Sequence, residues 1–365
     1  MDLQEAVALS LVPGLGRIRA AAAFKELRDH SGIGAVGLEH VVEVCLRDVD
    51  TAALAARARA EACTLLAAAA RQSVVPIDID DDRYPPLLRA IVDPPLVLWV
   101  RGDARVLAER AVAIVGSRAA SAYALEVASR LSGELTDRGV VVVSGLARGA
   151  DGAAHRGCLG HGGRTIAVLG SGPDVVYPPE HEALAAEIAA GLGALVSELG
   201  PGAPPLPEHF PLRNRLISGI SLAVVVVEAS DKSGSLITAR CALEQGREVM
   251  AVPGSILGGR NRGSHALLKD GAKVVETADD ILEELGWARA APAAIPGSQI
   301  SGKLQETDGL LSKLHPGETY DLDELSFTLE REGARLLPLL TDWEMRGVLV
   351  RLAGGRYALA AARTS

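Results

Sequence analysis

Four short segments of the sequence combine glycine, hydroxyl and arginine residues in a way that suits phosphate groups. Glycine turns leave backbone N–H groups free at the start of a helix, and neighbouring hydroxyl and guanidinium groups donate further hydrogen bonds to phosphate oxygens. The segments are Gly116-Ser117-Arg118, then Ser144-Gly145 with Arg148-Gly149, then Phe210 with Arg213-Asn214-Arg215, and finally Ser233-Gly234-Ser235 with Thr238. Each of these residues is a candidate contact to phosphate.

The third segment adds an aromatic ring to this chemistry. Phe210 precedes two arginines and an amide, and an aromatic ring beside guanidinium groups is the usual composition of a surface on which an unpaired base stacks. An alternative is that Phe210 belongs to the core and that each glycine turn is ordinary loop chemistry. Asp151 is interpreted as a helix cap or orienting residue, and His155 as a helix-face or capping residue. The combination of four such segments favours a phosphate-binding site.

The residues between these segments predict the sheet that would bring them together. Apolar runs that predict strands occur at residues 96–100, 111–115, 140–144, 165–169, 194–197, 223–228 and 248–252, with a last one near Lys273. Amphipathic stretches that predict helices alternate with them, for example at 122–138, 180–190 and 236–245. This alternation is typical of an α/β fold with a doubly wound, Rossmann-like parallel sheet covered on both faces. Such a sheet binds ligands beyond the carboxyl ends of its strands, so we expect Arg118, Arg148, Arg213 and Arg215 to converge there.

Composition divides the chain into four parts. Residues 1–80 are rich in alanine and leucine with helical periodicity, which predicts an N-terminal all-α domain of the SAM or helix-hairpin-helix type. Residues 84–285 are predicted to form the Rossmann-like core. Residues 286–303 gather Pro, Ala, Gly and Ser, which is typical of a linker. Residues 304–365 predict three helices and a β-hairpin, the composition of a winged-helix domain.

Two features near the termini could contact DNA or protein. Pro13-Gly14-Leu15-Gly16 resembles the turn of a helix-hairpin-helix, which presents backbone N–H groups to phosphate, and an ordinary αα-turn is the alternative. A second glycine-rich stretch, residues 32–37, is a weaker candidate. The recognition helix of the winged helix would begin with Glu330 and Glu332, whose charges repel phosphate. A protein-interaction role is therefore favoured there, and the sequence leaves both questions open.

Composition and motifs exclude several other classes of function. With 48% apolar and 23% charged residues the chain is that of a globular protein, and its apolar runs are too short for membrane insertion. There is no P-loop, and the glycines around Gly170 do not form a dinucleotide fingerprint, so no cofactor is predicted. The four cysteines and eight histidines lack metal-ligand spacing, and neither a metal site nor a catalytic residue is predicted. The acidic N-terminus without a signal sequence predicts a cytoplasmic protein.

The charge of the chain limits how it could bind nucleic acid. The formal net charge is −9, and residues 84–285 hold 19 basic against 23 acidic side chains. A surface covered in positive charge is therefore excluded. Any contact with phosphates has to be confined to a groove in which the basic side chains gather.

At these residues the sequence resembles the DprA/Smf family, the DNA-processing proteins of natural transformation. The resemblance runs from Tyr84-Pro85-Pro86 to Gly271-Ala272 and includes all four segments as well as Tyr177-Pro178. It implies a protein without enzymatic activity that binds and protects single-stranded DNA. It also implies that the protein acts on strands covered by single-strand-binding protein and helps to load the RecA recombinase onto them. It also implies a homodimer formed through the core. Ala150 and His265 depart from the family pattern, outside the candidate contacts.

Two other functions fit the same sheet. One is a nucleotide phosphoribohydrolase of the lysine-decarboxylase-like group, in which a glutamate stands three residues after a loop threonine. Here that position after Thr238 is Cys241, so the carboxylate that would act on the glycosidic bond is missing. The other is a sensor of small nucleotides, which would bind a mononucleotide saturably and no strand.

Overall fold

The computed structural model describes residues 2–16, 18–20, 22, 38–46, 50–191, 193–287, 319–328, 336, 340, 343–344, 349–351 and 356–359. The chain divides into two compact units, Met1–Ala293 and Ala294–Ser365. Several sequence predictions lie outside the described residues: the glycine-rich stretch 32–37, the linker from residue 288 onward, the helix at 306–314, most of the helix at 332–346, and both Glu330 and Glu332.

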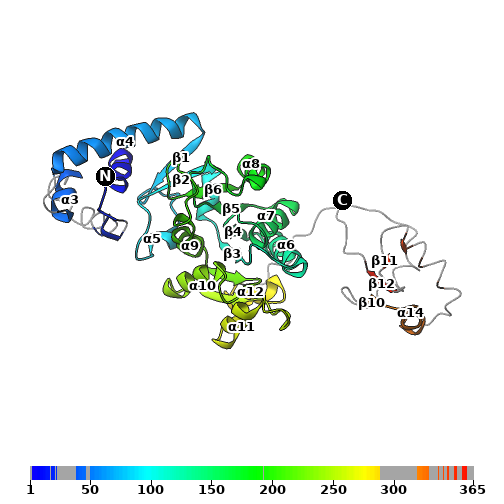
Figure 1. Cartoon of the computed structure of the whole chain (residues 1–365). Coiled ribbons are helices and arrows are strands. Elements are labelled where there is room, and N and C mark those ends of the chain that lie inside the picture. The colour runs from blue at the N-terminus through cyan, green and yellow to red at the C-terminus, as the bar shows by residue number, and fades with distance from the viewer. Residues whose placement is uncertain are drawn as a thin grey trace. The chain divides into compact units, whose positions relative to one another are not determined.

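The first unit is built on a large sheet whose main part is parallel (Figure 1). Its parallel strands are β3 (Ala111–Val115), β4 (Val141–Ser144), β5 (Thr165–Val168), β6 (Ala194–Ser197), β7 (Ala223–Val226), β8 (Glu248–Ala251) and β9 (Lys273–Val274). Their order across the sheet is β6-β5-β4-β3-β7-β8-β9. The chain therefore starts in the middle with β3, winds outward to β6, and then returns to continue beside β3 with β7. This is a doubly wound sheet, and the order reverses between β3 and β7.

Two further strands correct the sequence prediction at one edge. β1 (Val74–Asp78) pairs antiparallel with β2 (Val97–Gly102), and β2 pairs antiparallel with β6. The sheet is therefore mixed, and residues 74–78 belong to it although the sequence places them in an all-α domain. Antiparallel edge strands are common on parallel sheets, and Pro76 is tolerated in β1 because an edge strand can spare a backbone donor.

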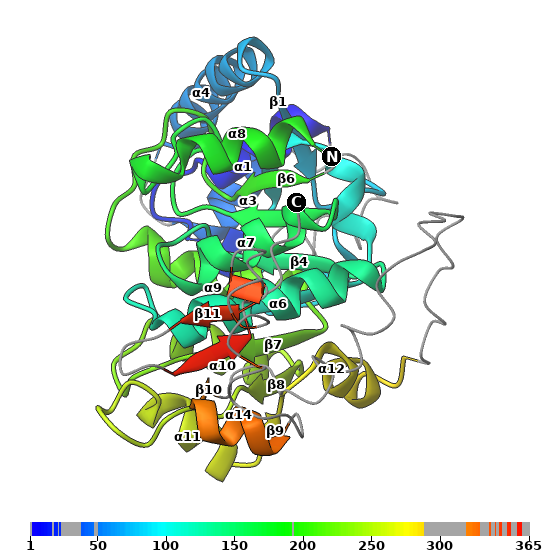
Figure 2. The same cartoon turned by 90° about the vertical axis from the view of Figure 1, so that its right-hand side faces the viewer.

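Helices cover both faces of this sheet. On one face α6 (Ala122–Asp137), α7 (Ala150–Gly160), α8 (Glu182–Ala190) and α12 (Ala278–Glu284) pack on alternate strand residues such as Val112, Ile114 and Ala167. On the other face α9 (His209–Ile220), α10 (Ser235–Glu244) and α11 (Arg262–Lys269) pack on residues such as Ala113 and Val226. In Figure 2 the strands β7 and β8 lie side by side, below α6 in the view. The prediction of an α/β sheet buried on both sides is confirmed.

The N-terminal helices pack on the edge of the sheet formed by β1 and β2. They are α1 (Leu3–Ser10), α3 (Leu38–Cys45) and the long α4 (Thr51–Arg71), and the short α5 (Pro86–Arg89) follows β1. Buried residues of α1 and α4 join the same apolar core as β1 and β2. Their assignment to a helix-hairpin-helix type of domain stays a prediction. No helix among the described residues is long and apolar enough to cross a membrane.

The second unit contains a small antiparallel sheet in the order β10 (Thr319–Tyr320), β12 (Tyr357–Leu359), β11 (Leu349–Arg351), with the helix α14 (Leu322–Thr328) beside β10. β11 pairs with β12 at the positions where the sequence predicts a hairpin. Leu325, Leu336 and Trp343 are buried in the core of this unit. Its identity as a winged helix stays a prediction.

Candidate functional site

A cavity of about 620 Å³ opens at the carboxyl ends of the parallel strands. It lies where the strand order reverses, because its walls include the loop after β3 and the loop after β7, which are neighbours in the sheet. Three of the four segments singled out in the sequence line it: Gly116, Ser117 and Arg118 from the first, Phe210, Arg213 and Asn214 from the third, and Ser233, Gly234, Ser235 and Thr238 from the fourth. The candidate residues of the second segment do not line it, although Ala147 in the same loop and Asp151 at the start of α7 do. We call it the strand-end cavity.

The first segment is held close to the start of α7. A Cβ added at Gly116 would lie 2.7 Å from Ala150 Cβ, and one added at Gly149 would collide with the Ser117 carbonyl oxygen. Gly149 has a φ of +72°, which favours glycine. These two glycines therefore let the loop after β3 and the loop after β4 touch. Ser117 Oγ accepts a hydrogen bond from Ala119 N–H (3.2 Å), and Arg118 next to it is exposed.

The second segment serves mainly as the scaffold of the cavity. Ser144 is buried and its hydroxyl donates to the Ile114 carbonyl (2.6 Å), which ties β4 to β3. The Asp151 carboxylate accepts hydrogen bonds from the N–H groups of Gly145 (3.1 Å) and Ala147 (3.3 Å). Burial raises the pKa of the Asp151 carboxyl, and the charge of Arg213 opposes this. The loop after β4 is thus wrapped around one buried carboxylate.

Arg213 completes this scaffold from α9. Its side chain is buried, and Nη1 donates to the Gly145 carbonyl (2.7 Å) and to the Val168 carbonyl. Burial lowers its pKa to about 10, and Asp151 acts in the opposite direction. Its guanidinium therefore joins the ends of β4 and β5 in the wall of the cavity.

The third and fourth segments meet across α9 and α10. Asn214 Nδ2 donates to the Gly234 carbonyl (3.3 Å), which links the two helices. Ser233 and Ser235 share a hydrogen bond between their hydroxyls (2.8 Å). Gly234 is the N-cap of α10 and has no side chain to accept hydrogen bonds from the first turn. The N–H groups of Leu236 and Ile237 donate to the Ser233 and Gly234 carbonyls. Within the described residues no hydrogen bond is found for the N–H groups of Gly234 and Ser235, which line the cavity. The start of α10 therefore has two backbone donors to offer an anion.

Two aromatic rings and a guanidinium form the open side of the cavity. The ring centroids of Phe210 and Tyr177 lie 5.4 Å apart at an angle of 52°. The Arg118 guanidinium carbon lies 5.5 Å from the Phe210 ring centroid, over its face. Phe210 is half-buried, so it is not a core residue. The site thus joins cationic groups to partly exposed aromatic surface.

The segment that carries this cavity matches a known protein family. The family model described as DNA recombination-mediator protein A matches residues 76–286, which contain the whole strand-end cavity. The chain belongs to this family. The DprA/Smf resemblance inferred from the motifs is confirmed.

Individual relatives agree with this assignment to the DprA/Smf family. Protein Smf of Escherichia coli is 41% identical over 287 residues, which cover 78% of this chain and 77% of that protein. DNA processing protein DprA of Bacillus subtilis is 46% identical over 222 residues, or 60% of this chain and 74% of that protein. The solved structure of DprA from Streptococcus pneumoniae matches with a TM-score of 0.69 at 35% identity, covering 78% of this chain and 98% of that one.

A second solved structure from the DprA/Smf family bears on the site. DNA processing protein A from Helicobacter pylori, whose structure concerns its single-stranded DNA binding mode, matches with a TM-score of 0.52 at 29% identity. The match covers 58% of this chain and 95% of that chain.

One expectation about this family member is wrong: the four arginines do not all converge. Arg215 is buried on the other side of α9, where Nη2 donates to both oxygens of Glu198 (2.7 Å each) and Nε lies 3.2 Å from Asp93 Oδ2. It lines a separate cavity with Cys241. Arg148 is exposed and paired with Glu180, and does not line the strand-end cavity. Arg118 and Arg213 do line it.

The lining of the cavity includes an aromatic and a cationic side chain that sequence reasoning did not assign to the site. Tyr177 lies in the loop between β5 and α8 and lines the cavity beside Phe210. Lys232 is exposed on the loop after β7 and also lines it. Lys232 could have been found, because it is one of only six lysines in the chain and directly precedes Ser233-Gly234-Ser235. Nothing local to Tyr177 indicates that it would meet Phe210.

His155 has a structural environment. Its Nδ1 lies 2.8 Å from Thr165 Oγ1, whose hydroxyl donates to the Val142 carbonyl (2.7 Å). Thr165 Oγ1 must therefore accept from Nδ1–H, which fixes the neutral tautomer. Burial lowers the pKa of His155 to about 3, with the nearby His181 adding to the effect. This agrees with its interpretation as a helix-face residue.

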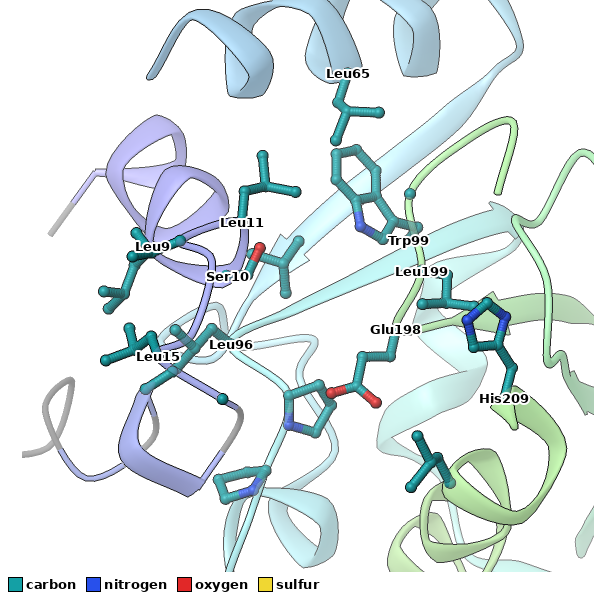
Figure 3. A pocket seen from close by; sticks show the side chains of 18 residues that line it. Leu9, Ser10, Leu11, Leu15, Leu65, Leu96, Trp99, Glu198, Leu199 and His209 are labelled. Carbon is teal, nitrogen blue, oxygen red and sulfur yellow. The ribbon is translucent and has the colours of Figure 1, made fainter. Parts of the chain in front are cut away.

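The Pro13–Gly16 turn packs against the sheet edge. Gly14 and Gly16 have φ values of +78° and +66°, and Leu15 between them is buried. Beside the turn lies a cavity of about 400 Å³, whose lining includes Leu9, Leu11 and Leu15 on one side and Trp99 and Leu199 on the other (Figure 3). Most of its lining is apolar, which does not suit phosphate. A contact between this turn and DNA stays a prediction.

Proposed function

We propose that this protein binds single-stranded DNA in the strand-end cavity. The observation that carries the proposal is the joining of cationic groups and aromatic faces in one cavity: Arg118, Lys232 and the start of α10 lie beside Phe210 and Tyr177. Membership of a family of DNA processing proteins supports it, as does the Helicobacter pylori relative whose structure concerns single-stranded DNA binding.

The chemistry of the cavity favours single strands over duplexes. Phosphates are attracted by the arginine, the lysine and the backbone N–H groups at the start of α10. The aromatic rings can stack only on a base whose face is accessible, which base pairs within a duplex do not offer. The residues assigned to contact the strand are therefore Gly116, Ser117, Arg118, Phe210, Asn214, Ser233, Gly234, Ser235 and Thr238. Ser144, Gly145, Gly149 and Arg213 are assigned to hold the loops that make these contacts.

The test is a titration of a fluorescently labelled oligonucleotide, measured by anisotropy over a range of salt concentrations. We expect tighter binding of the single strand than of the duplex of the same sequence. Arg118→Ala should weaken binding to all sequences and lower the slope of log affinity against log salt by about 0.7 for each phosphate that the variant no longer neutralises. Arg105→Ala is the matched control, because Arg105 is 81% exposed and paired with Asp103 away from the cavity.

Three results would count against the proposal. Equal affinity for duplex and single strand would reject the stacking role of the aromatic rings. An unchanged salt slope in Arg118→Ala would reject the phosphate contact. Competition by a mononucleotide as effective as competition by a strand would favour a sensor of small nucleotides.

We further propose that the bound strand is handed to another protein. A protein that holds a strand by phosphate contacts and stacking has no means of moving it, so its effect depends on a partner. The family resemblance points to the RecA recombinase, acting in the cytoplasm on strands covered by single-strand-binding protein, with this chain as a homodimer. Adding the protein should shorten the lag in DNA-dependent ATP hydrolysis by RecA on such strands, and Arg118→Ala should shorten it less. An unchanged lag would reject the loading role, and a monomer in light scattering would reject the dimer.

A further inference from the structure

A second cavity, of about 490 Å³, has walls close in sequence to those of the strand-end cavity, since Ser121 lies two residues after Ala119 and Glu228 two residues before Ser230. Its walls are the start of α6, with Ser121 and Tyr123, and the loop between β8 and α11, with Pro253, Leu257 and Arg260. The sequence analysis names no candidate contact at these positions, and the function proposed above does not use them.

Arg260 joins the two cavities. Its Nη1 donates to the Ala119 carbonyl (2.8 Å), and Ala119 itself lines the strand-end cavity directly after Arg118. A guanidinium has five N–H donors. Within the described part of the chain the other donors of Arg260 form no hydrogen bond, and the residue is exposed. A strand that leaves the strand-end cavity past Ala119 therefore meets a guanidinium with donors to offer.

Tyr123 supplies an aromatic surface beyond Arg260. Its side chain is 52% exposed, and its hydroxyl donates to the Pro253 carbonyl (3.1 Å), which holds the ring in place across the cavity. Leu257 is 77% exposed at the rim. A held, half-exposed ring beside aliphatic surface suits the face of an unpaired base.

One carboxylate, that of Glu228, also lines this cavity, and an accessible carboxylate would repel a phosphate. Glu228 is only 2% exposed, and its oxygens accept hydrogen bonds from Ser121 N–H (3.1 Å) and the Ser121 hydroxyl (2.6 Å). It therefore anchors the start of α6 from below and offers little surface to a ligand. The exposed residues of the cavity are Tyr123, Ser255, Leu257 and Arg260.

We infer that this second cavity is a further nucleotide-binding subsite for the same DNA strand. Arg260 contacts the phosphate that follows those held in the strand-end cavity, and Tyr123 stacks on the next unpaired base. The inference rests on the proposed function, because it extends the strand bound there. Continuity through the Arg260–Ala119 hydrogen bond favours the strand over a separate protein partner.

The experiment compares oligothymidylates of increasing length bound to the full chain. For the shortest strand that the wild type binds, we expect Tyr123→Ala and Arg260→Ala to have wild-type affinity, because that strand fills only the strand-end cavity. For longer strands we expect each variant to bind about ten-fold more weakly. In Arg260→Ala the salt slope for long strands should fall by about 0.7. Tyr123→Phe keeps the ring and should retain the affinity for long strands.

Controls and contrary results separate this inference from the proposed function. Arg105→Ala should bind strands of every length like the wild type. Long oligonucleotides that carry 5-iododeoxyuridine should cross-link to Tyr123 under ultraviolet light. If Tyr123→Ala and Arg260→Ala bind strands of all lengths with wild-type affinity, the inference is overturned and the proposed function stands. A surface that binds a protein partner would give this result. Failure of the wild type to bind any single strand overturns both.

Discussion

The Arg118 guanidinium covers a face of the Phe210 ring, with its central carbon 5.5 Å from the ring centroid. The ring is held in this position because Gly170 lies against it, where an added Cβ would come within 3.0 Å of the ring. Tyr177 contacts the same ring at 5.4 Å. The face beneath Arg118 becomes available to a base only when the guanidinium moves away. That movement would also release Arg118 toward a phosphate, so stacking and phosphate binding are coupled at this pair.

Replacing Phe210 should separate the contribution of base stacking from that of phosphate binding. We expect Phe210→Leu to lower the affinity for single-stranded DNA by about 1–3 kcal/mol for each base that stacks on the ring. The salt slope should stay as in the wild type, because no charge is removed. Anisotropy titrations at several salt concentrations measure both quantities. If Phe210→Leu binds single strands as tightly as the wild type, the ring is not a stacking platform.

Unlike Arg118, Arg215 should be needed for stability and not for DNA binding. Because its guanidinium is shared between Glu198 and Asp93 in a buried position, Arg215→Met should lower the free energy of unfolding by about 3 kcal/mol. The salt slope of strand binding should not change. Urea unfolding and salt-dependent titrations test the two statements, with Arg215→Lys as a variant that keeps the charge. A lower salt slope in a folded Arg215 variant would show that Arg215 does contact the DNA.

The different fates of Arg213 and Arg215 explain where sequence reasoning fell short. The sequence interpretation treats residues 210–215 as a loop at a strand end, in which both arginines can turn to the same side. The segment is instead the start of α9. Residues two apart on a helix point roughly 200° apart, so only one of the two can face the cavity. The helix is hard to predict because its first half buries Arg213, Asn214 and Arg215, and the apolar buried residues begin only at Leu216.

The strands of the sheet were easier to predict than the start of α9. Strands such as β3 and β7 are buried throughout, and strands buried on both faces appear in the sequence as continuous apolar runs. Their order then places the glycine-rich loops together. β1 was not predicted because Val74–Asp78 holds a proline and an aspartate, and only Val74 and Ile77 of its five residues are buried. The partners of Ser144 and Tyr177 depend on contacts between distant segments, which a single sequence does not reveal.

His155 should make the protein less stable in acid. Its pKa is about 3 in the folded protein against an ordinary value of 6.5. The unfolded chain therefore binds one more proton between these values, so stability falls as the pH is lowered through this window. From this group alone we expect a loss of about 2 kcal/mol between pH 7 and pH 5. Urea unfolding at the two pH values measures it.

Substituting the histidine isolates its contribution to this pH dependence. His155→Gln, which removes the titrating group, should lose about 2 kcal/mol less than the wild type between pH 7 and pH 5. His40→Gln is the control, because the His40 side chain is 60% exposed. Equal pH dependence in the wild type and in His155→Gln would show that His155 takes up its proton as easily in the folded protein as in the unfolded chain.

Gly149 should be needed for both stability and DNA binding, and Gly162 offers a matched comparison. Both have positive φ angles, +72° and +69°, but only at Gly149 would a Cβ collide with the Ser117 carbonyl, whereas nothing lies within 4 Å at Gly162. Gly162→Ala should therefore cost only the roughly 1–2 kcal/mol of a left-handed alanine and bind DNA normally. Gly149→Ala should cost more and bind single strands about ten-fold more weakly at temperatures where it is folded, since the collision displaces the backbone that carries Ser117 and Arg118. Equal losses of stability and equal DNA affinities in the two variants would mean that the contact between the loops after β3 and β4 does not position the phosphate-binding residues.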